Sequence, residues 1–179
     1  MNTSKQYDQV IDKCRELYSA KLKDYGSSWR ILRLASLTDQ IFIKAKRIRQ
    51  FQESGIMKVK EDISSEYIGI VNYSIIALIQ LELPLVEDNN YNIDSALALE
   101  LYDKHSSAAK QLMEAKNHDY DESWRLMRQS SILDLILTKI LRLKQIEDNK
   151  GKVVASEGVD ANYYDIINYA VFALIRLSE

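Results

Sequence analysis

A pattern of charged residues, Asp-x-x-x-x-Lys-x-x-Arg, occurs at residues 39–47 of this 179-residue chain and again at residues 134–142. Mg²⁺ prefers oxygen ligands and is usually held by one or two protein carboxylates together with substrate phosphate. Lysine and arginine neutralise phosphate charge, arginine through its planar fork of donors. The repeated pattern therefore favours a site for a phosphate chain and a metal ion.

A second phrase, Lys-x-x-Asp-Tyr-x-x-Ser-Trp-Arg, occurs at residues 21–30 and again at 116–125. Tyr25, Trp29 or Tyr73 could supply an apolar wall or a stacking surface for a base. In a purely structural alternative, Asp24 bonds loop amides and Trp29 plugs the end of a helical bundle. The first lysine and the last arginine of each phrase are expected to be solvated or to lie near phosphate. By itself the phrase is more specific for a fold than for a reaction.

These phrases belong to an internal duplication. Residues 20–50 match residues 115–145 at 14 of 31 positions, and residues 67–81 match 163–177 at 8 of 15. Two copies are too few for a solenoid, in which each repeat contacts only its neighbours. We therefore expect a pseudo-symmetric pair of repeats that share one core.

Helical periodicity of apolar residues predicts the elements that must position these side chains. Gly26 suits a left-handed helix end and a nearby serine can cap the next helix, while Pro84 opens a polar linker at about 84–93. The fold class is all-α: a six-helix bundle built from two three-helix repeats, about 5–83 and 94–178, in a single domain 1–179. The expected helices are about 5–23, 29–52, 61–83, 94–117, 122–147 and 159–178.

Composition excludes several functional classes. The net charge of −2 argues against a nucleic-acid polymer as partner, because phosphate contacts need clustered Lys and Arg. Two histidines and the single Cys14 cannot form a zinc ligand set or an internal disulfide. The most apolar stretch, residues 67–85, is interrupted by polar residues and indicates a buried helix, not a membrane span. A cytoplasmic protein without membrane partners is expected.

Almost all of the residues that both copies share on the second helix fall within one arc of about 140° on a helical wheel. This polar face could be a phosphate and metal site. It could equally be a buried salt-bridge network, in which Asp39 pairs with Arg33 or Arg47, Asp134 mirrors it, and the network fixes how the copies dock.

The third helix of each copy carries a shared asparagine, Asn72 or Asn168, within apolar sequence. One turn earlier the second copy has Asp165, whereas the first copy has Gly69, with Glu66 another turn back. If acids on this helix bind metal, either one of two mirror sites is weakened or both copies contribute to a composite site.

The two phrases, followed by Asp-x-x-Asn-Tyr-Ala on the third helix, resemble a bacterial and phage helical family described as a nucleotide-modification-associated domain. That family is distantly similar to MazG-like all-α nucleoside triphosphate pyrophosphohydrolases, which are Mg²⁺-dependent bundles that release pyrophosphate. The MazG pattern has Glu-x-x-Glu on one helix and Glu-x-x-Asp on the next, and this chain departs from it. The resemblance implies a hydrolase that acts on the phosphate chain of a small-molecule nucleotide, with Mg²⁺ or Mn²⁺ as cofactor.

Two hypotheses remain open: this enzyme, and a catalytically silent module for nucleotide binding or assembly. Further association into a homo-oligomer is also left open. The expected metal ligands are Asp39, Asp134, Glu66 and Asp165. The expected phosphate ligands are Lys44, Arg47, Lys139, Arg142, Arg33 and Arg128. Residues expected beside the nucleotide or within the motif are Asp24, Tyr25, Trp29, Asp119, Tyr120, Trp124, Asn72 and Asn168.

Overall fold

The computed structural model describes residues 2–56, 62–86, 89–153 and 157–179, and these residues form helices, short turns and connecting segments without a strand. The all-α prediction and the expected number of helices are confirmed, with a short 3-10 turn after the first helix of each repeat. The elements are α1 (Thr3–Tyr25), η1 (Ser28–Ile31), α2 (Leu34–Ser54), α3 (Ile63–Glu82), α4 (Ser95–Tyr120), η2 (Ser123–Leu126), α5 (Gln129–Asp148) and α6 (Val159–Ser178).

The predicted start of the second helix was wrong in both repeats. Trp29 lies in a separate 3-10 turn, the backbone is extended at Leu32 and Arg33, and α2 begins only after them. In the first repeat Gln80 Nε2 of α3 donates to the backbone carbonyls of Trp29, Arg30 and Leu32 at 3.2, 2.9 and 2.8 Å. The second repeat forms the same turn with Arg176 at the equivalent position. These tertiary hydrogen bonds stabilise a turn that helix periodicity does not reveal.

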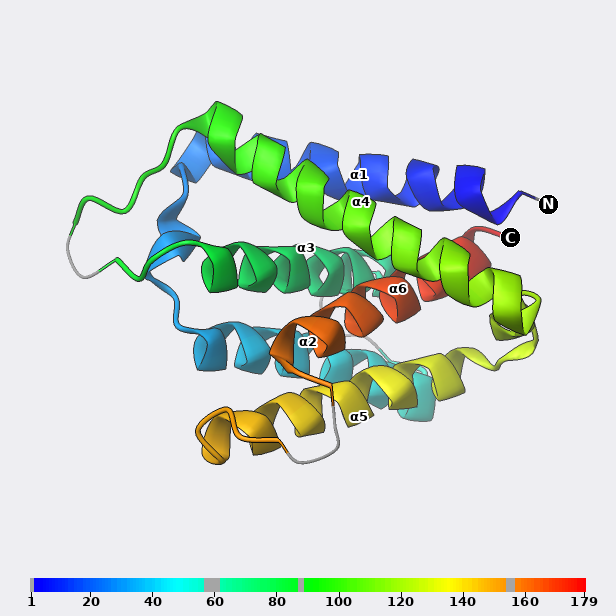
Figure 1. Cartoon of the computed structure of the whole chain (residues 1–179). Helices are drawn as coiled ribbons and strands as arrows, with labels where there is room; N and C mark the ends of the chain where they lie inside the picture. The colour runs from blue at the N-terminus through cyan, green and yellow to red at the C-terminus, as the bar shows by residue number, and fades with distance from the viewer. Residues whose placement is uncertain (1, 57–61, 87–88, 154–156) are drawn as a thin grey trace.

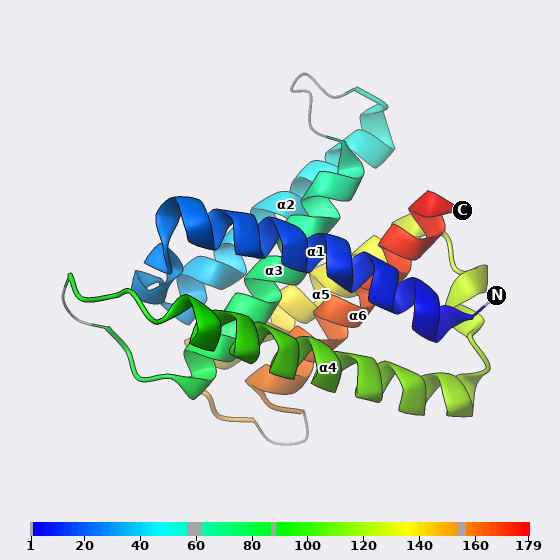
Figure 2. The same ribbon diagram turned by 90° about the horizontal axis from the view of Figure 1, so that it is seen from above.

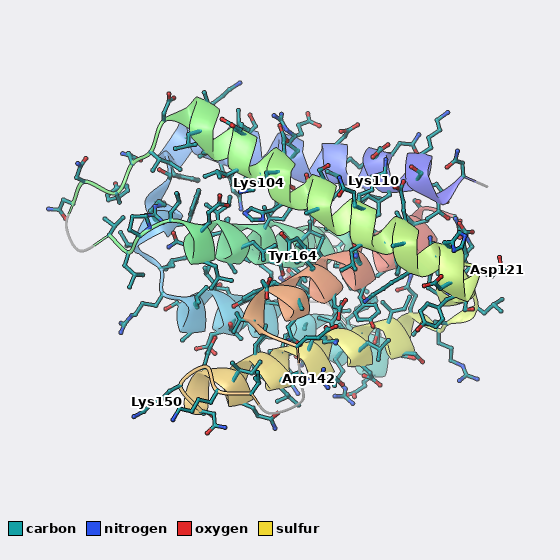
Figure 3. All side chains as sticks on the ribbon, in the orientation of Figure 1. Lys104, Lys110, Asp121, Arg142, Lys150 and Tyr164 are labelled. Atoms are coloured by element: carbon teal, nitrogen blue, oxygen red, sulfur yellow. The ribbon has the colours of Figure 1, made fainter. Side chains whose placement is uncertain are left out.

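Gly26 ends the first helix with a positive φ, but its ψ of −153° lies outside the left-handed helical region that was predicted. Gly26 has φ +63°, and a Cβ atom there would lie 2.3 Å from Oδ1 of Asn92, which accepts a hydrogen bond from the Ser27 backbone amide at 3.0 Å. At the equivalent end of α4, Asp121 adopts the left-handed conformation with φ +49° (Figure 3). The predicted serine cap is absent: Ser27 caps no helix with its side chain, and Arg33 precedes α2.

The helices form three layers of two (Figure 1). The α1 and α4 helices form one outer layer, α3 and α6 the middle layer, and α2 and α5 the other outer layer, and the view from above agrees (Figure 2). Each layer therefore takes one helix from each repeat. The middle helices are buried along most of their length, as their nearly continuous apolar sequence predicts.

Two buried asparagines form hydrogen bonds between the two repeats. Asn72 accepts a hydrogen bond from Tyr102 of the second repeat at 2.7 Å, and Asn168 accepts one from Tyr7 of the first repeat at 2.7 Å. The amide groups donate to backbone carbonyls of their own repeats, at Cys14 and Ala109. Both amides are thus satisfied within the core, which gives the shared Asn a structural reason.

None of the helices in the described ranges combines the length and apolarity that a membrane crossing requires.

Candidate functional site

A cavity of about 650 Å³, the first pocket, lies in the first repeat between α1, η1, α2 and α3. Its walls include the half-buried aromatic rings of Trp29 and Tyr73, and exposed Tyr25 stands at its rim. Trp29 belongs to the 3-10 turn η1, which precedes α2 and places the Trp29 side chain beside α3. The residues lining the cavity come from both phrases of the duplication and from the third helix.

Two lysines and one carboxylate supply the charges of the first pocket. Lys44 Nζ lies 3.7 Å from Glu66 Oε2 and 5.8 Å from the centre of the Tyr73 ring. Glu66 is buried and also accepts a hydrogen bond from Arg47 Nη1 at 2.7 Å. Lys21 is exposed, and within the described part of the chain no carboxylate pairs with it. Positive charge therefore exceeds negative charge in this pocket.

Gly69 forms part of the floor of the first pocket, and the Lys44 side chain lies directly over it. A Cβ atom at Gly69 would lie 2.6 Å from Lys44 Cε and 2.7 Å from Cδ. Because these atoms belong to the flexible end of a lysine, a larger residue here would displace Lys44 without moving the backbone.

A second pocket of about 100 Å³ lies between α4, η2 and α6 of the second repeat. The two 3-10 turns are at opposite ends of the bundle in both views, so the pockets are well separated (Figures 1 and 2). The structure thus forms two separate cavities, not one composite site. The second pocket is lined by Lys116, Tyr120, Ser123, Trp124, Asn168 and Tyr169, which correspond to Lys21, Tyr25, Ser28, Trp29, Asn72 and Tyr73 of the first.

Two substitutions explain why the second pocket is small. Asp165 stands at the position equivalent to Gly69, and its two carboxylate oxygens lie 2.8 Å from Lys116 Nζ and 2.8 Å from Lys139 Nζ. Phe172 stands where the first repeat has an isoleucine, and its ring stacks on Trp124 with centroids 4.2 Å apart and planes 5° from parallel. Burial alone would lower the pKa of Lys116, but the hydrogen bond and charge of Asp165 raise it overall.

The structure does not bring the four predicted metal ligands together. Asp39 and Asp134 have side chains 64% and 60% exposed, and each pairs with the other repeat: Asp39 with Lys144 at 3.5 Å and Asp134 with Arg49 at 3.9 Å. These pairs join α2 and α5, as the docking alternative expected, but the expectation of a buried network was wrong because both acids are largely exposed, and the partners differ from Arg33 and Arg47.

Glu66 and Asp165, the other two predicted metal ligands, line different pockets. In the ranges that the structure describes, no group of three or more His, Cys, Asp or Glu side chains could hold a metal ion. Each pocket therefore offers a single carboxylate.

The predicted phosphate ligands fall into two groups. Lys44, Arg47 and Lys139 are paired with the carboxylate of their own repeat, as given above. Arg33 and Arg128 are exposed residues that precede α2 and α5, and Arg142 is half-buried on α5 (Figure 3). Among the six, only Lys44 lines the first pocket.

Of the motif residues, Tyr25, Trp29 and Asn72 line the first pocket, and their counterparts Tyr120, Trp124 and Asn168 line the second. The acids of the phrase, Asp24 and Asp119, are exposed and line neither pocket.

Sequence reasoning understated Lys21 and Lys116 and missed Ile76 and Phe172 as pocket residues. The two lysines carried a usable signal, because both copies retain them at the same spacing before the shared tryptophan. Ile76 and Phe172 are equivalent positions at which two otherwise similar segments differ. A comparison that considers only the residues shared by both copies cannot identify them.

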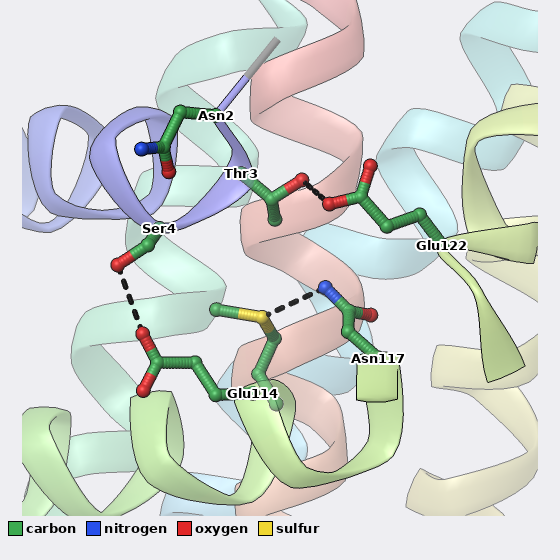
Figure 4. A pocket seen from close by; sticks show the side chains of 7 residues that line it. Asn2, Thr3, Ser4, Glu114, Asn117 and Glu122 are labelled. Atoms are coloured by element: carbon green, nitrogen blue, oxygen red, sulfur yellow. Dashed lines mark hydrogen bonds between the residues drawn. The ribbon is translucent and has the colours of Figure 1, made fainter. Parts of the chain in front are cut away.

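A third hollow lies where the start of α1 meets the end of α4 (Figure 4). Glu114 accepts a hydrogen bond from Ser4 Oγ at 2.8 Å, and Glu122 accepts one from Thr3. Its two carboxylates thus bind hydroxyl groups of α1, and the hollow has no counterpart in the first repeat among the pockets described above.

Comparison with known protein families finds one family, described as nucleotide modification associated domain 1, whose model matches residues 21–81 and again residues 116–177. The two matches cover more than half of the chain and begin at Lys21 and Lys116, the lysines of the two pockets. No curated protein and no solved structure shows a significant match.

Proposed function

This chain belongs to the nucleotide modification associated domain 1 family, and from that premise we propose that its first pocket binds a nucleotide. The base packs against the aromatic wall that includes Trp29 and Tyr73. The phosphate contacts the ammonium groups of Lys21 and Lys44.

The observation that carries this proposal is the arrangement of the two lysines. Lys21 has no carboxylate partner in the described ranges, and Lys44 is 3.7 Å from its nearest one, beyond hydrogen-bonding distance. Lysine binds phosphate as a compact point charge, and aromatic rings supply large apolar contact areas for a base. A cavity of about 650 Å³ also falls within the roughly 300–1,000 Å³ range of small-molecule sites.

One observation favours a second candidate, hydrolysis of the phosphate chain. Glu66 is a buried carboxylate that lines the first pocket, and Mg²⁺ or Mn²⁺ can be held by one protein carboxylate together with phosphate oxygens. Such an ion would stabilise charge that develops on the phosphate chain. Glu66 would hold the ion, Lys44 and Lys21 would orient the phosphates, and Arg47 would hold the Glu66 carboxylate in position through their 2.7 Å hydrogen bond.

Binding is tested with ribo- and deoxyribonucleoside mono-, di- and triphosphates, with and without Mg²⁺, by isothermal titration calorimetry and thermal unfolding. A ligand of the native state raises the melting temperature. We expect Lys21→Ala/Lys44→Ala to weaken binding by about tenfold or more, equivalent to at least roughly 1.4 kcal/mol. Lys23→Ala is the matched control, because Lys23 is exposed on the same helix and does not line the pocket. Equal affinity of the double variant and wild type would contradict the proposal.

Hydrolysis is tested separately by pyrophosphate release from the ribo- and deoxyribonucleoside triphosphates, with Glu66→Gln as the variant. Turnover that Glu66→Gln abolishes while nucleotide binding persists would support the enzyme. Binding without turnover, in wild type as in the variant, would support the catalytically silent module.

A further inference from the structure

The second pocket contains the same polar and aromatic framework as the first, and we propose that it is a closed copy whose ligand subsites are filled by the protein's own side chains. Asp165 occupies the anion subsite and Phe172 occupies the ring subsite. The identification of the ligand as a nucleotide rests on the proposed function, whereas the occupancy of the second pocket rests on its own contacts.

The anion subsite is defined by the lysine pair. In the second repeat, Lys116 and Lys139 each contact one oxygen of Asp165 at 2.8 Å. Their counterparts in the first repeat, Lys21 and Lys44, line the first pocket together with Gly69, which has no side chain. The two lysines of the second repeat thus share one carboxylate, whereas in the first repeat Lys44 lies 3.7 Å from Glu66 and no carboxylate in the described ranges pairs with Lys21. The Asp165 carboxylate marks where a ligand phosphate would lie in the first pocket.

The ring subsite is defined by the shared tryptophan. Phe172 stacks on Trp124 with centroids 4.2 Å apart and planes 5° from parallel, and Arg125 Cζ lies 4.4 Å from the centre of the indole, so that Trp124 is only 7% exposed. In the first repeat, Ile76 replaces the phenylalanine and Trp29 stays half-buried at the cavity. A planar ring from a ligand can thus contact Trp29 as Phe172 contacts Trp124.

The two internal groups are seven residues apart on α6 and so lie on the same face, separated by about 10 Å along the helix axis. A ligand that replaces both must carry an aromatic ring at one end and an anion at the other. This is the chemistry of a nucleotide, and not that of inorganic phosphate or of a free base. Gly69 and Ile76 are accordingly the residues that keep the first pocket open.

The test exchanges these residues between the repeats. Gly69→Asp should close the first pocket by placing a carboxylate between Lys21 and Lys44, and should weaken nucleotide binding at least tenfold. The fold should tolerate it, since the new Cβ meets only the flexible end of Lys44. Gly69→Asn, which has the same size without the charge, should weaken binding less. Wild-type affinity in Gly69→Asp would overturn the proposal.

The reverse exchange, Asp165→Gly/Phe172→Ile, should open the second pocket. Calorimetry should then find two nucleotide sites per chain in place of one, and adding Gly69→Asp should return the number to one. A folded double variant that still binds one nucleotide would overturn the proposal. If the double variant fails to fold, the Gly69→Asp and Gly69→Asn pair decides alone.

Thermal unfolding with pyrophosphate distinguishes a failure of the closed-copy inference from a failure of the proposed nucleotide binding. Suppose that wild type binds no nucleotide, but pyrophosphate stabilises Asp165→Gly more than wild type. The proposed nucleotide binding then fails, and the inference that Asp165 occupies an anion subsite is supported. If wild type binds a nucleotide and Gly69→Asp binds it equally well, the proposed function stands and the closed-copy inference fails.

Discussion

Tyr67 and Tyr163 occupy equivalent positions on α3 and α6, but their hydroxyl groups have different surroundings. Tyr163 Oη lies 2.9 Å from Thr38 Oγ1, which also donates to Glu147 at 3.1 Å. Tyr67 Oη is buried and has no hydrogen-bond partner within the described residues. The residue of α5 that corresponds to Thr38 is Leu133, which cannot form the bond. Burial raises the pKa of Tyr163 to about 12 despite the contact with Thr38.

This difference predicts unequal effects of removing the two hydroxyls. Tyr163→Phe should lower the free energy of unfolding by about 1 kcal/mol, because a satisfied buried hydrogen bond is lost. Tyr67→Phe should be neutral or stabilising, since it removes an unsatisfied polar group. Urea unfolding of both variants beside wild type measures this. Equal losses of stability would show that Tyr67 has a partner in solution, such as a buried water.

At the scale of elements, the α2–α5 surface carries two reciprocal ion pairs, Asp39 with Lys144 and Asp134 with Arg49. Arg49 and Lys144 are themselves equivalent positions, so the pairs obey the pseudo-symmetry of the repeats. All four side chains remain between a third and two thirds exposed, and exposed pairs contribute little to stability. Their location favours a role in aligning two helices over a role in binding phosphate.

Asp39→Ala and Asp134→Ala should therefore each change the free energy of unfolding by less than about 1 kcal/mol. Nucleotide affinity and its Mg²⁺ dependence should match wild type in both variants, because neither residue lines a pocket. Chemical denaturation and calorimetry check the two parts. A Mg²⁺-specific loss of affinity in either variant would restore these acids as metal ligands.

The whole molecule is an interlocked pair of repeats. The middle layer joins α3 to α6, and the buried amides of Asn72 and Asn168 each accept a hydrogen bond from the first helix of the other repeat. Neither repeat can thus complete its own core. The two pockets are nevertheless contained within single repeats, so one can change while the other is retained.

A chain of residues 1–86 should not fold as a monomer, because the face of α3 that contacts α6 would be exposed and Asn72 would lose Tyr102. Circular dichroism should show low helicity, or size-exclusion chromatography should show a dimer in which a second copy replaces the missing repeat. The full chain is the control. A monomer that unfolds cooperatively would contradict the interlocked core.

The sequence by itself determined the duplication, the number of helices and the buried third helices, because periodicity and internal identity are local properties of the chain. It also pointed to Trp29 and Lys44 of the first pocket. It placed Asp39 and Asp134 in a metal site because a helical wheel shows which residues share a face, but not which neighbouring helix that face meets.

Only the tertiary structure decided where that face points and which pocket is open. Gln80 of α3 donates hydrogen bonds to the 3-10 turn that carries Trp29, and no local pattern within that turn encodes them. The larger pocket is lined by Gly69 and Ile76, and the smaller one by Asp165 and Phe172. The role of these four residues in shaping the pockets is evident only from the tertiary structure, which shows the lysines and the tryptophan that lie beside them.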